Sequence, residues 1–273
     1  FLAPALGFIA RLVRSNRHTR VITIFDNVVP HEKRFGDTIL TRFFVKSIDG
    51  ALVMTRAVET DLRQFSAVLP CVVSPHPLFD NYSVPVSRAE AIVRLKLCPA
   101  DRFILFFGFI RQYKGLDLLL RAMAEQCVRD LGVKLIVAGE FYESEKPYFD
   151  LIHQLGIGDR ISFHSHFISD DEVKYYFSAA SLVVQPYRSA TQSGVTQVAY
   201  HFNKPMIVTN VGGLAEIVPD GVCGYVVEPD PAEISVAICD FFRGEENRFE
   251  GGIQEKKKEY SWDRLTEALR SLA

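Results

Sequence analysis

The chain of 273 residues lacks both a strong charge excess and a long apolar run. Its formal net charge is −2 and its pI is about 6.4, so no global positive field would gather nucleic acid. The longest apolar runs, such as Phe103 to Phe109, are far shorter than the roughly 20 residues that a membrane-spanning helix needs. These absences argue against a nucleic-acid partner and against a transmembrane segment.

The sequence also lacks paired cysteines and the glycine-rich motifs of common nucleotide-binding proteins. The five cysteines are odd in number and form no Cys-x-x-Cys pair, so neither a disulfide framework nor a zinc site is indicated, and a reducing cytoplasm fits best. No G-x-G-x-x-G or G-x-x-x-x-G-K-[ST] motif is present, which removes the main support for dinucleotide redox enzymes and P-loop proteins.

The first segment begins at Phe1, without a Met, in an apolar stretch that predicts a helix already under way. A signal peptide is the competing reading, but here the positive charge follows the apolar run. Basic residues outnumber Asp26 and Glu32 in this segment: Arg11, Arg14, Arg17, Arg20, Lys33 and Arg34. Such a face suits a solvated surface or, alternatively, peripheral contact with anionic lipid at the inner side of a membrane.

From Asp101 onward, short apolar runs alternate with amphipathic ones, a pattern typical of buried parallel strands joined by helical crossovers. Strands are predicted at 103–107, 135–138, 161–163, 182–185, 206–209 and 224–227. Helices are predicted at 116–125, 148–155, 170–179, 195–202 and 231–242. The fold class is therefore α/β, with a complete Rossmann-like, doubly wound parallel sheet.

Upstream, the pattern supports only half of a second Rossmann-like domain. Strands are predicted at 21–25, 50–54 and 71–74, with helices at 38–46 and 57–65, and a lead-in helix to the next domain is predicted at 87–97. Turn and proline residues place a boundary near Pro85. We expect a partial domain over 1–85, a complete one over 86–260 and a last helix over 261–273, with a Gly251-Gly252 break in the charged helix that precedes it.

Two loops could hold an anion. In the first, Gly108 follows a strand, and Arg111 and Lys114 precede a helix, where fixed cations suit a diphosphate. The second loop runs from Gln185 to Thr196 and offers amides and hydroxyls at another helix start. Each loop also has a purely structural interpretation. Arg111 and Lys114 would then only be solvated at a loop tip, and Ser193 or Thr191 would only cap the following helix. Loops at the carboxyl ends of strands in one sheet would lie close together.

Four stretches, in this order, resemble family-four glycosyltransferases (group 1, retaining, GT-B fold): 107–117, Ile-Val-Ala-Gly-Glu at 136–140, the helix at Gly194, and Val-Gly-Gly-Leu-Ala-Glu-Ile at 211–217. The final Ser-Trp-Asp helix resembles the family's C-terminal helix, which crosses back to the N-terminal domain. The resemblance implies transfer of a sugar from a nucleotide donor, with retention and without a metal or other cofactor. The family serves polysaccharide and glycoconjugate synthesis.

The same resemblance assigns residues. Arg111 and Lys114 match the cation pair that neutralises the departing diphosphate of a UDP- or GDP-linked sugar. The other donor-side positions are Gly108, Gly139, Glu140, His166, Phe167, Thr191, Gln192, Ser193, Gly194, Val195 and Thr196. Asp26, Asn27 and His31 match the side that meets an acceptor, which would be a glycan, a lipid-linked molecule or a small molecule.

The chain departs from the family's pattern where two carboxylates usually stand. Thr191 and Ala199 occupy those positions, and Gln192 or Gln197 would have to supply hydrogen bonds instead. Phe109 replaces a usual arginine, which leaves its work to Arg111. Three hypotheses follow: a glycosyltransferase inactive as this chain alone, a catalytically silent nucleotide-sugar-binding module, or a nucleotide-sugar epimerase of the same fold.

Two further stretches invite functional readings that the residues do not favour. Ser169 to Glu172 suits a helix capping box better than a metal site. Phe163 ends an apolar strand and is predicted to be core, not a stacking platform.

Overall fold

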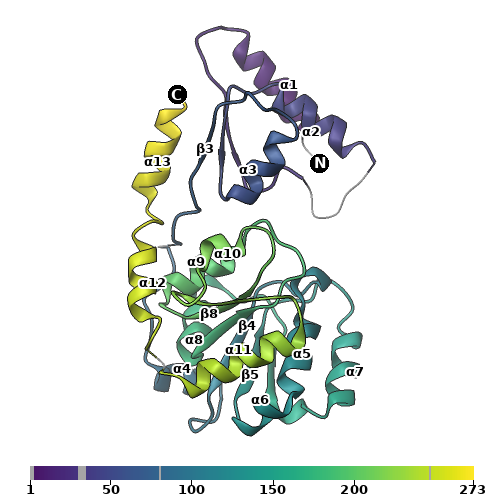
Figure 1. The fold of residues 1–273 in the computed structure, drawn as a ribbon, viewed down its shortest axis with the longest axis vertical. Coiled ribbons are helices and arrows are strands. Elements are labelled where there is room, and N and C mark those ends of the chain that lie inside the picture. Colours follow the sequence, from purple (N-terminus) through teal and green to yellow (C-terminus); the bar gives the residue numbers. More distant parts are fainter. Residues whose placement is uncertain (1–2, 30–34, 80, 246) are drawn as a thin grey trace. The chain divides into compact units, whose positions relative to one another are not determined.

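The computed structural model describes residues 3–29, 35–79, 81–245 and 247–273. The chain divides into two compact units (Figure 1). Unit 1 contains residues 1–77, 190–192 and 259–273, and unit 2 contains residues 78–189 and 193–258. In the part of the chain that the structure describes, no helix combines the length and apolarity needed to cross a bilayer.

Unit 2 is built on a six-stranded, wholly parallel sheet with the strand order β6-β5-β4-β7-β8-β9. Its strands are β4 (Phe103–Phe107), β5 (Lys134–Ala138), β6 (Ile161–His164), β7 (Leu182–Gln185), β8 (Met206–Thr209) and β9 (Gly224–Val227). The order reverses between β4 and β7, as in a Rossmann fold. The doubly wound sheet predicted from the alternating pattern is confirmed.

Helices cover this sheet in two layers. One layer joins α5 (Leu116–Ala124), α6 (Gln126–Asp130), α7 (Lys146–Leu155) and α11 (Pro231–Arg243), which contact one another. The other contains α4 (Arg88–Arg94), α8 (Asp170–Ala179) and α9 (Gly194–His201). Of the remaining helices, α10 (Leu214–Ile217) contacts β8 and α12 (Glu250–Lys257) contacts α9. Because both faces are covered, β4, β5, β7 and β8 are almost completely buried, which explains their unbroken apolar runs.

Unit 1 has a smaller parallel sheet in the order β1-β2-β3. It comprises β1 (Ile22–Phe25), β2 (Gly50–Val53) and β3 (Cys71–Val73), with helices α1 (Ala3–Arg14), α2 (Asp37–Val45), α3 (Arg56–Arg63) and α13 (Trp262–Ser271). Side chains of α1, α2 and α3 share one core cluster with Phe25 and Val53. On the opposite face, Leu265 and Leu272 of α13 pack against Leu52.

The predicted glycine break in the charged helix is wrong, and the predicted capping box at Ser169 is met only in part. Helix α12 begins at Glu250 and includes Gly251 and Gly252. Gly252 packs closely, because a Cβ there would lie 2.1 Å from the carbonyl oxygen of Val222. Ser169 occupies the N-cap position of α8, but its hydroxyl donates to Glu172 Oε2 at 3.1 Å instead of accepting from a backbone N–H. Ser169 is therefore the N-cap residue, as predicted, but without the cap hydrogen bond of a capping box.

Candidate functional site

Two loops follow β4 and β7, the neighbouring strands between which the strand order of unit 2 reverses. In open parallel sheets, ligands bind outside the carboxyl ends of the strands at this position. The β4 loop leads through the 3₁₀ turn η1 (Gln112–Lys114) into α5, and the β7 loop leads into α9. Both predicted anion loops therefore lie at the switch point of one sheet.

Gly108, Lys114 and Val195 converge at this point. Gly108 has a φ of 98°, a conformation that favours glycine. A Cβ at Gly108 would lie 3.2 Å from Lys114 Nζ and 3.5 Å from Val195 Cγ2. The ammonium group of the first loop is thus held beside the first turn of α9, where backbone N–H groups favour an anion.

Lys114 is a half-buried cation with an aromatic ring beneath it. Its Nζ lies 5.4 Å from the centre of the Tyr187 ring. Burial lowers the pKa of Lys114, the Tyr113 phenol opposes this shift, and the positive charge of Arg111 adds to it. An anion bound at Nζ would stabilise the charged form and reverse the shift.

Arg111 is oriented by a second aromatic ring. It is the N-cap residue of η1, and its guanidinium carbon lies 5.0 Å from the centre of the Tyr142 ring. Tyr142 follows β5 and packs against Phe109, with ring centres 4.4 Å apart. Phe109 therefore supports the ring that holds Arg111, although it occupies the position of the family's usual arginine.

The β5 loop packs tightly against the β4 loop at Gly139. This residue has a φ of 137°, and a Cβ on it would lie 2.3 Å from the carbonyl oxygen of Gly108. The next residue, Glu140, accepts a hydrogen bond at its backbone oxygen from the N–H of Ile110 at 2.8 Å. Gly139 and Glu140 thus fix the backbone around Gly108, which gives them a structural task beside their predicted role toward the nucleoside.

The start of α9 presents backbone groups more than side chains. Ser193 is the N-cap residue; its Oγ accepts from the N–H of Val195 at 3.3 Å and lies 3.2 Å from the Tyr187 hydroxyl oxygen. Thr196 is buried, and its hydroxyl donates to the carbonyl oxygen of Ser193. Gly194 is exposed. A ligand would therefore meet the backbone of Gly194, while the Ser193 and Thr196 hydroxyls are engaged within the helix cap.

His166 and Phe167 follow β6 and are exposed. His166 lines a hollow of about 230 Å³ together with His164 of β6 and residues of α4 and α8. Burial lowers the pKa of His164, and the nearby His166 ring adds to the effect. Phe163 is half-buried, with its ring centre 5.0 Å from that of Phe149. It belongs to an aromatic cluster, in keeping with its predicted packing role.

Thr191 and Gln192 group with unit 1, unlike the other predicted donor residues. The Thr191 hydroxyl donates to Asn27 Oδ1, and Gln192 Nε2 donates to Asp26 Oδ1 at 2.8 Å. Both side chains thus contact residues predicted to lie on the acceptor side. His31, the third residue of that set, lies outside the described residues.

The positions of the second family carboxylate and its suggested substitute are both buried. Ala199 is fully buried in α9, and Gln197 is 1% exposed. Neither amide atom of Gln197 has a hydrogen-bond partner among the residues that the structure describes. Whether Gln197 supplies hydrogen bonds in place of a carboxylate therefore stays a prediction; in the structure its side chain is buried within unit 2.

Three residues of the site escaped the sequence analysis: Tyr142, Tyr187 and Arg188. Tyr187 and Arg188 stand within the second anion loop, but aromatic and charged residues in a loop do not reveal their partners. Burial raises the pKa of Tyr187 to about 12, against a lowering by its hydrogen bond to Ser193. The Tyr187 ring therefore stays neutral between Lys114 and the cap of α9.

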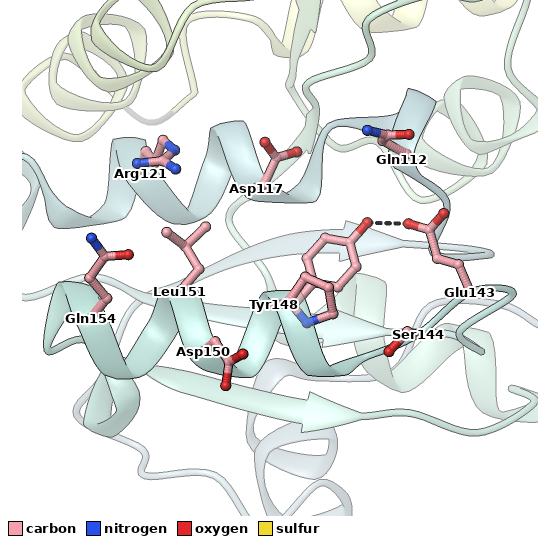
Figure 2. A pocket seen from close by; sticks show the side chains of 10 residues that line it. Gln112, Asp117, Arg121, Glu143, Ser144, Tyr148, Asp150, Leu151 and Gln154 are labelled. Atoms are coloured by element: carbon pink, nitrogen blue, oxygen red, sulfur yellow. Dashed lines mark hydrogen bonds between the residues drawn. The ribbon is translucent and has the colours of Figure 1, made fainter.

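A second hollow, of about 530 Å³, lies between α5 and α7 (Figure 2). Gln112 and Asp117 line it from the side of α5, and Glu143 and Tyr148 line it from the side of α7. The Tyr148 hydroxyl donates to Glu143, and burial together with this carboxylate raises the pKa of the phenol. Among its acidic and phenolic lining groups, Tyr148 is paired with Glu143, and Asp117 is paired with Arg188 beside the hollow. We assign no ligand to this hollow.

The fold and the site together define a Rossmann-like unit with an anion-competent switch point, of the GT-B class. The family model described as glycosyl transferases group 1 matches residues 101–243. A curated relative, D-inositol 3-phosphate glycosyltransferase 1 of Catenulispora acidiphila, is 34% identical over 200 residues, or 68% of this chain and 47% of that protein. The D-inositol 3-phosphate glycosyltransferase of Saccharomonospora viridis is 32% identical over 80% of this chain and 54% of its own length.

Solved structures share the fold. Sucrose-phosphate synthase from Thermosynechococcus elongatus aligns with a TM-score of 0.80 at 20% identity, over 97% of this chain and 71% of that chain. Anabaena HepE in complex with UDP-glucose aligns with a TM-score of 0.78 at 16% identity, over 99% and 76%. The chain belongs to the group 1 glycosyltransferase family. It spans about half the length of the curated relatives it matches.

Proposed function

We propose that unit 2 binds the donor of a glycosyltransferase that moves a sugar from a nucleotide diphosphate to an acceptor hydroxyl. The observation that carries the proposal is the placement of Lys114 Nζ beside Gly108 and Val195. There the Lys114 ammonium, the glycine backbone at Gly108 and the start of α9 lie close together at the switch point. A diphosphate needs such fixed positive groups and close access to the backbone.

The chemistry follows from where charge develops. As the sugar leaves, negative charge grows on the diphosphate, so a prepositioned ammonium lowers the barrier more than it strengthens ground-state binding. Lys114 and Arg111 would supply this charge, and we therefore propose a metal-independent reaction. Retention of the anomeric configuration is proposed with it, on the family membership of the chain. Insensitivity of turnover to EDTA and an unchanged anomeric configuration in the product, measured by NMR, are the expected results.

The donor is proposed to be a UDP- or GDP-linked sugar. HepE, which shares the fold, was solved with UDP-glucose, which supports a uridine nucleotide as the first candidate. The direct test is calorimetric titration of the protein with UDP, GDP, ADP and their sugar conjugates, in parallel with Lys114→Ala. Binding of one nucleotide that weakens in Lys114→Ala supports the proposal. Binding that Lys114→Ala leaves unchanged would place the donor elsewhere.

A catalytically silent nucleotide-sugar-binding module is a second candidate. It is favoured by Thr191 and by the buried Ala199, which leave the chain without carboxylates at either family position. Incubating the full-length protein with its donor, with and without candidate acceptors, separates the possibilities. A glycosylated acceptor supports transfer, unchanged donor despite binding supports the silent module, and an epimerised donor without any acceptor supports an epimerase.

The acceptor-side contribution and the cellular place are also proposals. We propose that Asp26, Asn27 and His31 serve an acceptor hydroxyl. We further propose that the protein works in the cytoplasm, at the inner face of a membrane. Residues 3–20 include four arginines and no acidic residue, and Phe8, Ile9 and Leu12 of α1 are more than half exposed. Binding to anionic but not to neutral phosphatidylcholine vesicles, reduced in Phe8→Glu, is the expected result.

A further inference from the structure

A bidentate ion pair joins the two loops of the candidate site. Arg188, in the loop after β7, donates from Nη1 to Asp117 Oδ1 at 2.6 Å and from Nη2 to Asp117 Oδ2 at 2.7 Å. Asp117 lies in the first turn of α5, directly after the turn that carries Lys114. A guanidinium fork fixes the direction of its partner as well as its distance.

The same arginine also grips the backbone of the η1 turn. Its N–H donates to the carbonyl oxygen of Tyr113 at 2.7 Å, and its Nη1 lies 3.3 Å from the carbonyl oxygen of Gln112. These two carbonyls immediately precede Lys114. Arg188 therefore contacts the turn through its main chain and its side chain, and contacts the helix beyond the turn through Asp117.

Close backbone packing completes the arrangement. Gly115 has a φ of 65°, and a Cβ there would lie 1.9 Å from the carbonyl oxygen of Pro186. Between Pro186 and Arg188 stands Tyr187, whose ring faces Lys114 Nζ. The segment 186–188 thus touches the turn on both sides of Lys114 and also provides the surface on which its ammonium rests.

We propose that Arg188 and Asp117 are positioning residues that hold Lys114 against Tyr187 and beside Gly108. The inference rests on the proposed function and deepens it. It assigns an ion pair that fixes the Lys114 ammonium, the group proposed to bind the diphosphate, without itself touching the donor. Both side chains are about one-third exposed, at 38% and 31%, and an exposed ion pair contributes little to overall stability. The main consequence of this pair is accordingly geometric: a cation must be fixed before the reaction to stabilise a transition state well.

The decisive test is the ionisation of Lys114 itself, followed by NMR in full-length protein with ¹³C-labelled lysine side chains. The Lys114 signal is assigned by its loss in Lys114→Arg. We compare Arg188→Gln and Asp117→Asn, and use Arg121→Gln, an exposed arginine on the same helix, as the matched control. Thermal unfolding by circular dichroism establishes that each variant is folded, and Arg188→Lys replaces Arg188→Gln where the latter is not.

The two variants distinguish positioning from simple electrostatics. Loss of the Asp117 carboxylate would by charge alone lower the pKa of a nearby ammonium, whereas loss of the Arg188 charge would raise it. Release of Lys114 from its buried place raises the pKa in both cases. A raised Lys114 pKa in Asp117→Asn as well as in Arg188→Gln is the expected result. An unchanged or lowered pKa in folded Asp117→Asn would overturn the proposal.

Nucleotide binding and turnover give a second readout. With the sugar conjugate of the nucleotide that binds the parent protein, and an acceptor that the parent protein glycosylates, we expect about a tenfold loss of kcat in each variant, a smaller change in the KM for the donor, and partial recovery in Arg188→Lys. The double variant should be no worse than the single ones, because both remove one device. Additive losses would contradict joint action. If no nucleotide binds the parent, the proposed function fails while the NMR result still decides the fate of the pair.

Discussion

Unit 1 and unit 2 use the same kind of parallel sheet but complete it to different degrees. In unit 2, the sheet has six strands, and residues of the two central strands β4 and β7 are almost fully buried. In unit 1, only β2 is buried throughout, and Ile24 of β1 is 44% exposed. The difference teaches that the anion-competent loops stand on the unit with the complete sheet, where a rigid frame can hold Lys114 in place.

The strongest way to sharpen this comparison is to weaken each sheet at an equivalent place. Leu105 in β4 and Leu52 in β2 are both fully buried. Truncation of either to alanine should cost about 2–5 kcal/mol of unfolding free energy, from lost burial and the cavity left behind. We expect nucleotide binding to be lost when unit 2 unfolds in Leu105→Ala. In Leu52→Ala, where unit 1 is destabilised, we expect nucleotide binding to survive. Chemical denaturation followed by calorimetry checks this, and equal loss of binding in both would erase the distinction.

Within unit 2, two glycines separate backbone conformation from close packing. Gly115 and Gly132 have nearly the same φ, 65° and 66°, but a Cβ meets the Pro186 carbonyl oxygen only at Gly115 and meets open space at Gly132. Gly132→Ala should cost about 1–2 kcal/mol, the strain of the left-handed conformation. Gly115→Ala should cost clearly more and also weaken nucleotide binding. Similar melting temperatures for the two variants would contradict the tight packing of the two loops.

The role of Lys114 is tested against another lysine of unit 2. Loss of a charge-assisted hydrogen bond to a phosphate costs about 1.5–3 kcal/mol, so Lys114→Ala should weaken nucleotide binding by roughly 10- to 100-fold. Lys146→Ala removes an exposed lysine paired with Asp150 on α7 and should leave affinity unchanged. Calorimetric titration of both variants decides whether the site or the general charge of the unit attracts the nucleotide.

The smallest expected effect concerns pH. Burial lowers the pKa of Lys114, so its ammonium loses its proton at a lower pH than an exposed lysine does. Nucleotide affinity should therefore fall as pH rises, starting below the ordinary lysine pKa of about 10.4. In Lys114→Arg the fall should disappear over this range, because arginine stays protonated. Titrations between pH 7 and 10 measure the effect, and an identical alkaline fall in Lys114→Arg would assign it to another group.

How much could be predicted from the sequence varies along the chain. The inner strands of unit 2 were predictable because β4, β5, β7 and β8 are short apolar runs that are buried on both faces, as with 103–107 and 206–209. The helical conformation of Gly251 and Gly252 in the first turn of α12 was not, because a glycine pair in isolation favours a break. Contact with Val222, a residue distant in sequence, reverses that preference.

The candidate site divides in the same way. The sequence alone determined that Gly108, Arg111 and Lys114 precede a helix and that Ser193 begins another, since local order and capping chemistry are written in neighbouring residues. The tertiary structure alone decided that Lys114 rests on Tyr187, that Arg188 grips Asp117 and that Gln197 is buried. These facts depend on which strands are neighbours in the sheet, and strand order arises from packing between residues far apart in the chain.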